Sequence, residues 1–68
     1  MEYNMIQEIT FTKIQAAGFT TKDIFSIRKA TNGLSPSIAF GVLEDMWNET
    51  KDSRFETLMN SLITKIRV

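Results

Sequence analysis

Apolar residues recur at helical spacing along most of this chain, and polar or glycine-containing stretches interrupt the pattern in three places. The interruptions fall at Gly18, at residues 32–36 and at residues 51–53. They leave segments of roughly helical length at residues 3–17, 21–31, 36–49 and 53–67. The pattern therefore predicts an all-α fold, a compact bundle of four short helices that forms a single domain over residues 1–68.

The first of these segments carries a mixed signal. Met5, Ile6 and Ile9 share one face of a helix at about 100° per residue. Residues 9–12, in contrast, are β-branched or aromatic and suit a short strand. Because the pattern shows no second strand to pair with them, we interpret the segment as a helix, and a strand at residues 8–14 stays as the alternative.

The second segment has clear signals at both ends. A threonine at position 20 or 21 can cap its amino terminus, and Asp23 falls in the first turn, where the helix dipole favours an anion. Ile24, Ile27 and Thr31 form a stripe along one side of this helix, beside Arg28. Asn32 or Gly33 then supplies the left-handed residue that commonly ends a helix.

The third segment has an unusually wide apolar arc. Ser35 as the amino-terminal cap and Pro36 at the first helical position mark its start. Its apolar residues are Ile38, Ala39, Phe40, Val42, Leu43, Met46 and Trp47. They cover roughly 200° of the helix, about twice the arc of an ordinary surface helix. Either neighbouring helices bury this arc from both sides, or part of it stays exposed for a partner.

The fourth segment is the clearest amphipathic helix of the sequence. It starts at Asp52 or Ser53, and Glu56 lies three residues after the serine, as in a capping box. Its apolar residues are Phe55, Leu58, Met59, Leu62, Ile63 and Ile66. Because they form one stripe of roughly 140°, we expect a single helix that packs one side against the rest of the domain.

The second and third segments, with the short turn between them, predict a helix-turn-helix-like corner at residues 22–49. In DNA-binding proteins the second helix of such a corner enters the major groove. Here Glu44 and Asp45 would approach a polyanion, and the start of the helix offers no side chain that makes strong base contacts. The chain also has eight basic and eight acidic residues, without the basic excess typical of nucleic-acid binding.

A helix-turn-helix regulator that binds DNA as a dimer is therefore the alternative function. The residues that would contact DNA in this alternative are Arg28, Lys29, Ser37, Lys51 and Arg54. All except Ser37 would bind phosphates, and Ser37 would lie at the groove.

The composition offers little catalytic chemistry. The chain has no histidine and no cysteine, so it lacks the usual nucleophile–base pairs, the commonest metal ligands and disulfides. It has no glycine-rich phosphate loop, and the adjacent Glu44 and Asp45 do not face each other on a helix. We expect no enzymatic activity, no metal, no cofactor and no small-molecule substrate.

Protein binding is the function that the sequence favours. A domain of 68 residues is marginally stable unless self-association, a partner or efficient helix packing supports it. Phe40, Leu43 and Trp47 gather at one edge of the wide apolar arc, and clustered aromatic residues are usual interface anchors. We predict a small regulatory protein that binds a protein partner or a second copy through these three residues. The alternative is that they belong to the core.

The sequence also bears on location. No apolar run approaches the roughly 20 residues that a membrane span needs. Residues 1–4 lack the basic and apolar regions of a signal peptide. We therefore expect a cytoplasmic protein that does not bind membranes, and its small size suits a regulator of the phage or mobile-element type.

Overall fold

The computed structural model describes residues 1–67, which form helices and one small sheet. The elements, in chain order, are β1 (Glu2–Ile6), α1 (Phe11–Ala16), α2 (Thr21–Thr31), α3 (Pro36–Thr50), α4 (Ser53–Leu62) and β2 (Ile63–Arg67). The two strands pair antiparallel, with Glu2 opposite Arg67 and Ile6 opposite Ile63. The fold is therefore a mixture of α and β structure, and the all-α prediction is wrong.

The error lies in the first and the fourth segments. Residues 3–17 are not one helix, because β1 precedes the shorter helix α1. The fourth helix ends at Leu62, and the chain continues as β2, so Ile63 and Ile66 leave the helical stripe. The strand that β1 needs as a partner comes from the other end of the chain. That strand lies within the segment that the apolar stripe assigned to the fourth helix, so the pattern showed no second strand.

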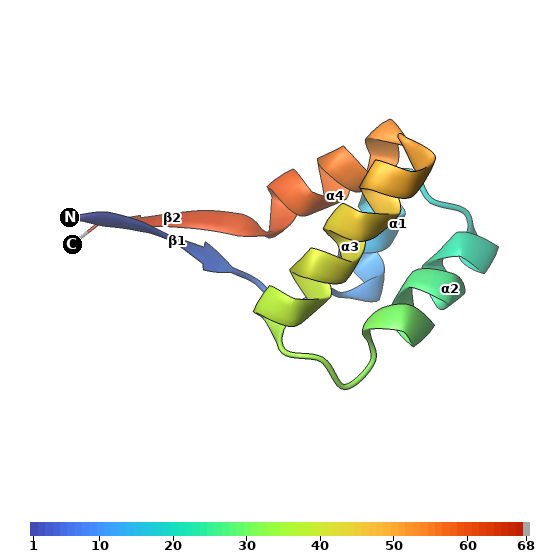
Figure 1. The fold of residues 1–68 in the computed structure, drawn as a ribbon, viewed down its shortest axis with the longest axis horizontal. Coiled ribbons are helices and arrows are strands. Elements are labelled where there is room, and N and C mark those ends of the chain that lie inside the picture. The colour runs from blue at the N-terminus through green and yellow to red at the C-terminus, as the bar shows by residue number, and fades with distance from the viewer. Residues whose placement is uncertain (68) are drawn as a thin grey trace.

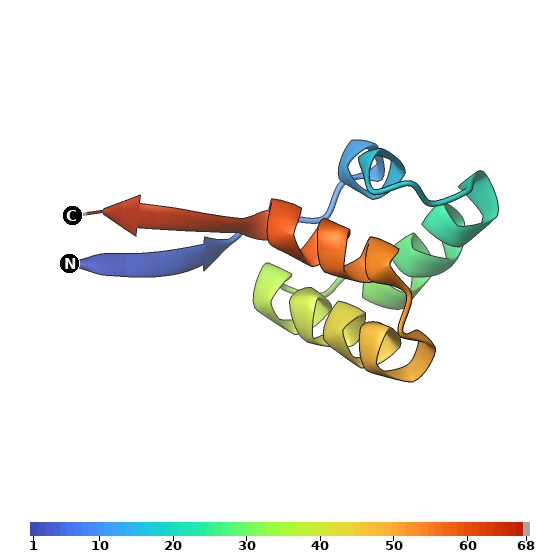
Figure 2. The same cartoon turned by 90° about the horizontal axis from the view of Figure 1, so that it is seen from above.

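The helices form a compact body around an apolar core. Figure 2 shows α3 and α4 lying side by side and running in opposite directions, and they contact each other. The fully buried side chains come from all four helices of the described region: Ile14, Ile24, Leu43, Leu58 and Leu62. Burial of one such side chain contributes about 1.5–3 kcal/mol. None of the helices in residues 1–67 combines the length and the apolarity required to cross a bilayer.

The helix ends follow the local signals of the sequence. Thr20 caps α2 by accepting a hydrogen bond from the Asp23 backbone N–H at 3.4 Å. Gly33 follows α2 with a φ of +77°, a conformation that glycine adopts without strain. Pro36 is the first residue of α3. The predicted stripe of α2 is confirmed, because Ile24, Ile27 and Thr31 are its buried residues.

The two strands form a ribbon that projects from the helical body. Figure 1 shows the ribbon pointing away from the helices, with both chain ends at its tip. The protein is consequently elongated, with principal extents of 40 × 24 × 22 Å. The side chain of Gln7 joins the base of the ribbon to the body, since it donates a hydrogen bond to Thr64 Oγ1 and accepts one from Lys13 Nζ.

Candidate functional site

The three residues predicted to bind a partner do not form an exposed surface. Leu43 is fully buried in the core, with an exposed fraction of 0%. Phe40 and Trp47 are partly buried and pack against the core. Leu43 therefore cannot contact a partner without unfolding, and its assignment to an interface is corrected.

Three elements cover the wide apolar arc of α3. The helix contacts α4, α2 and β1. Of these three elements, the strand β1 was not predicted from the sequence. Trp47 also lies under the ammonium group of Lys51, whose Nζ is 4.9 Å from the ring centroid. The alternative that the arc is buried from several sides therefore describes most of α3.

The candidate DNA-binding residues separate into two groups. Arg28, Lys29 and Ser37 lie near the turn between α2 and α3, whereas Lys51 and Arg54 lie beyond the other end of α3. Because α3 has 15 residues, its two ends are about 22 Å apart. The structure does not bring the five residues together at one point.

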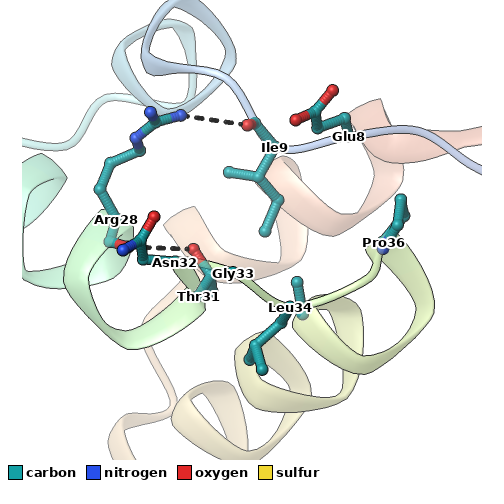
Figure 3. Close-up of a pocket in the computed structure, with 9 residues that line it drawn as sticks. Glu8, Ile9, Arg28, Thr31, Asn32, Gly33, Leu34 and Pro36 are labelled. Atoms are coloured by element: carbon teal, nitrogen blue, oxygen red, sulfur yellow. Dashed lines mark hydrogen bonds between the residues drawn. The ribbon is translucent and has the colours of Figure 1, made fainter.

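Arg28 lies at the edge of a small pocket beside the α2–α3 turn. Figure 3 shows its side chain reaching the backbone carbonyl of Ile9, to which Nη1 donates a hydrogen bond at 3.3 Å. Glu8 lies next to Ile9, and the turn residues Asn32 and Gly33 line the other side. The pocket has a volume of about 100 Å³, so it holds no more than a very small group.

Arg54 is engaged with acidic and aromatic neighbours. Its guanidinium donates hydrogen bonds to both carboxylate oxygens of Asp52, the shortest from Nη2 to Oδ2 at 2.6 Å. Asp23 lies 3.8 Å away, and the Phe19 ring centroid is 4.8 Å from the guanidinium carbon. The hydrogen bond from Arg54 lowers the pKa of Asp52 from 3.8, and the same bond raises the pKa of Arg54. These contacts occupy the group that a DNA phosphate would require.

A second, larger hollow lies between α2 and the carboxyl end of α3. It has a volume of about 370 Å³ and an apolar floor that includes Ile27, Met46 and Phe55. Asp23 and Glu49 contribute acidic groups to its rim. Within residues 1–67, no group of three or more acidic side chains is arranged to hold a metal ion.

The large exposed apolar side chains lie elsewhere. In the described residues they are Met1, Tyr3, Met5, Phe11, Phe25, Leu34 and Ile38. Leu34 and Ile38 flank the start of α3, with exposed fractions of 40% and 59%. Tyr3 and Met5 lie on one face of the ribbon, because side chains alternate between faces along a strand.

Sequence reasoning missed both of these apolar surfaces. In "ITKIR" the two apolar residues, Ile63 and Ile66, are three positions apart, which fits a helical stripe and not the alternation of a half-buried strand. The sequence therefore offered no clear signal for β2. Ile38 was counted in the arc of the third segment, and nothing in its spacing distinguished it from buried Leu43. The difference is determined by tertiary contacts, since Leu43 belongs to the core of the folded chain and Ile38 is exposed.

Comparison with protein-family models, with curated proteins and with solved structures found no match to this chain.

Proposed function

We propose that this chain is a small, non-enzymatic cytoplasmic regulator that binds another protein through the amino-terminal end of α3. One observation carries the proposal: Leu34 and Ile38, four residues apart, expose large apolar side chains at the α2–α3 corner. Exposed apolar residues that gather on a small domain are typical of interaction sites. We call Leu34, Pro36 and Ile38 the corner surface.

The charges around α3 support a protein as the partner. Its charged residues, Glu44, Asp45 and Glu49, are all acidic and exposed. An acidic helix repels the phosphates of nucleic acid, whereas a neutral or basic protein surface can approach it. Arg54 is paired with the carboxylate of Asp52, which reduces the positive charge that it offers to a polyanion.

The experiment that tests this proposal places a photoreactive amino acid at Ile38. A matched control carries the same group at Glu44, which is exposed on the same helix but lies outside the corner surface. After irradiation in the source cells, we expect a covalent adduct with a different protein from position 38 and little from position 44. Equal yields from both positions, or no adduct from position 38, would contradict the proposal.

DNA binding is a second candidate because two helices joined by a short turn, α2 and α3, could serve as a helix-turn-helix unit. The turn at residues 32–35 joins α2 to α3, and Lys29 and Ser37 are exposed on either side of it. Binding to mixed-sequence DNA should then weaken steeply as salt increases. Substitution of Lys29 by Gln should reduce that salt dependence, and the absence of binding at low salt would exclude this candidate.

A further inference from the structure

The ribbon has two strands, so each strand has one edge without a strand partner, and α3 contacts part of β1. A two-stranded antiparallel ribbon is marginally stable alone, and its unpaired backbone groups can pair with another strand. Figures 1 and 2 show that the ribbon projects beyond the helices in both views. The helical body thus leaves much of the ribbon accessible, and the chemistry of each edge decides what can pair there.

The backbone direction along β1 follows from one hydrogen bond at the base of the ribbon. The Gln7 N–H donates to the Leu62 carbonyl at 2.8 Å. Because backbone groups alternate in direction along an antiparallel strand, Tyr3 and Met5 also direct theirs toward β2. Glu2, Asn4 and Ile6 therefore direct their N–H and C=O groups outward, to the free edge of β1.

The two edges differ in charge. On β2, the outward-directed residues include Lys65 and Arg67, and charged residues of this kind prevent strands from pairing at an edge. If two copies of β2 paired antiparallel about Lys65, the two lysines would lie directly opposite each other, which is destabilising. The edge of β1 carries the neutral Asn4 at its centre, and its one charged residue, Glu2, lies at the end of the strand.

We propose that two copies of this chain pair through the edges of their β1 strands, antiparallel and centred on Asn4. The two ribbons then form one four-stranded sheet in the order β2–β1–β1–β2. Across the new junction, Asn4 lies opposite Asn4 of the second copy, and Glu2 lies opposite Ile6. These residues direct their backbone N–H and C=O groups into the junction, where they can form hydrogen bonds. The outward groups of β1 are therefore satisfied without a change of register.

The same pairing joins the apolar faces of the two ribbons. Tyr3 comes to lie opposite Met5 of the second copy, in the closer, non-hydrogen-bonded type of pair. Within each copy, Tyr3 faces Ile66 and Met5 faces Thr64. The four-stranded sheet thus has one continuous face with tyrosine, methionine and isoleucine side chains, and no like charges oppose each other at the junction.

The inference extends the proposed function rather than depending on it. The corner surface stays available to a different protein, and the ribbon supplies the self-association that a domain of this size commonly uses for stability. A twofold pairing of one edge with itself is also closed, so it produces a dimer and not a fibre.

Sedimentation equilibrium of three full-length chains tests the proposal. Asn4→Pro removes the outward N–H at the twofold axis but no hydrogen bond within the ribbon. Lys65→Pro is the matched control, because Lys65 faces Asn4 in the ladder and its N–H points to the opposite edge. At about 100 μM, where a dimer of micromolar affinity is almost fully formed, we expect dimers for the natural chain and Lys65→Pro. We expect Asn4→Pro to weaken association about 100-fold or more.

Several results would overturn the proposal. A monomeric natural chain would do so, as would dimerisation of Asn4→Pro at natural strength. Equal loss of dimer in both proline variants, with native helix content by circular dichroism, would assign the contact to the ribbon as a whole and not to the β1 edge. None of these results affects cross-linking from position 38, so failure of this inference is distinguishable from failure of the proposed function.

Single-cysteine variants give a second test that does not depend on proline. The chain has no cysteine, so an introduced one can form only an intermolecular disulfide. Across the junction the two Asn4 Cα atoms would be about 5.5 Å apart, within the range that a disulfide spans. Under mild oxidation Asn4→Cys should yield covalent dimer and Lys65→Cys little. Equal yields would contradict pairing through β1.

Discussion

At the residue scale, Arg54 links parts of the chain that are distant in sequence. It lies in the first turn of α4, and its guanidinium donates hydrogen bonds to the carboxylate of Asp52. The same guanidinium lies near Asp23 of α2 and over the Phe19 ring. Asp52 also caps α4 by accepting a hydrogen bond from the Arg54 backbone N–H at 3.0 Å. One arginine therefore connects the start of α4 to α2 and to the loop before it.

This arrangement predicts a pH-dependent contribution to stability. The pKa of Asp52 is lowered in the folded chain, so its contribution is present above the ordinary value of 3.8 and is lost as the pH falls through the lowered value. Arg54→Gln should reduce the melting temperature slightly at neutral pH, since the pair is exposed to solvent. The difference between the two chains should shrink as the pH falls through the lowered pKa of Asp52.

Thermal melts followed by circular dichroism would measure this effect. Lys29→Gln removes the same charge from an exposed site on α2 and serves as the control. A stability difference for Arg54→Gln that stayed constant down to acid pH would show that the Asp52 pair is not its source.

Local sequence signals were most reliable where one residue determines the backbone. Gly33 and Pro36 marked the end of α2 and the start of α3 correctly, because left-handed φ and the proline ring are properties of single residues. The charge network of Arg54 was not predictable in this way. Asp23 and Phe19 come near it only after α2 folds back onto α4.

At the element scale, tertiary contacts determine which apolar residues of α3 are buried and which are exposed. Its wide apolar arc was read as a surplus, but β1, α2 and α4 together cover most of it. The exposed remainder is Ile38, at the end where the turn from α2 leaves the helix less covered. The sequence showed that α3 has a wide apolar arc, but which of its residues are exposed could not be predicted, because β1 from the start of the chain also contacts this helix.

Two glycine substitutions test how backbone conformation contributes to the stability of α3 and of the turn before it. Gly41 is exposed within α3, and an added Cβ would meet nothing within 4 Å. Gly41→Ala should therefore stabilise the protein by about 0.5–1 kcal/mol through better helix propensity. Gly33→Ala meets no atom either, but its φ of +77° is strained for alanine, and we expect destabilisation of about 1 kcal/mol.

Urea denaturation of the two alanine variants would measure both free energies of unfolding. Since neither methyl group contacts another residue, the opposite signs would isolate the backbone effect. Destabilisation by Gly41→Ala would indicate that α3 is less regular at this point than the structure describes.

At the scale of the whole molecule, the protein consists of a helical body with a core and a ribbon beside it. The body holds the fully buried side chains, whereas the ribbon residues are exposed or only partly buried. Elements with little buried apolar surface open more readily than the core. The two parts should therefore differ in local stability.

Amide hydrogen exchange would measure this difference. At low protein concentration, the amides of Tyr3 and Met5 should exchange much faster than that of Leu58, because the ribbon opens without the helices. At high concentration, the Asn4 amide should gain protection as dimers form. Ribbon amides that were as slow as the Leu58 amide in the monomer would show that the ribbon opens only with global unfolding.

The pairing of the first element with the last also determines when the ribbon can form during synthesis. β1 leaves the ribosome before every helix, and 57 residues separate Gln7 from its partner Thr64. At about 5–20 residues per second, β1 waits roughly 3–11 s for β2. During this interval both edges of β1 are unpaired, and neighbouring nascent chains on one messenger carry the same strand. The proposed β1–β1 pairing therefore does not require a complete ribbon, because β1 is available before β2 has been made.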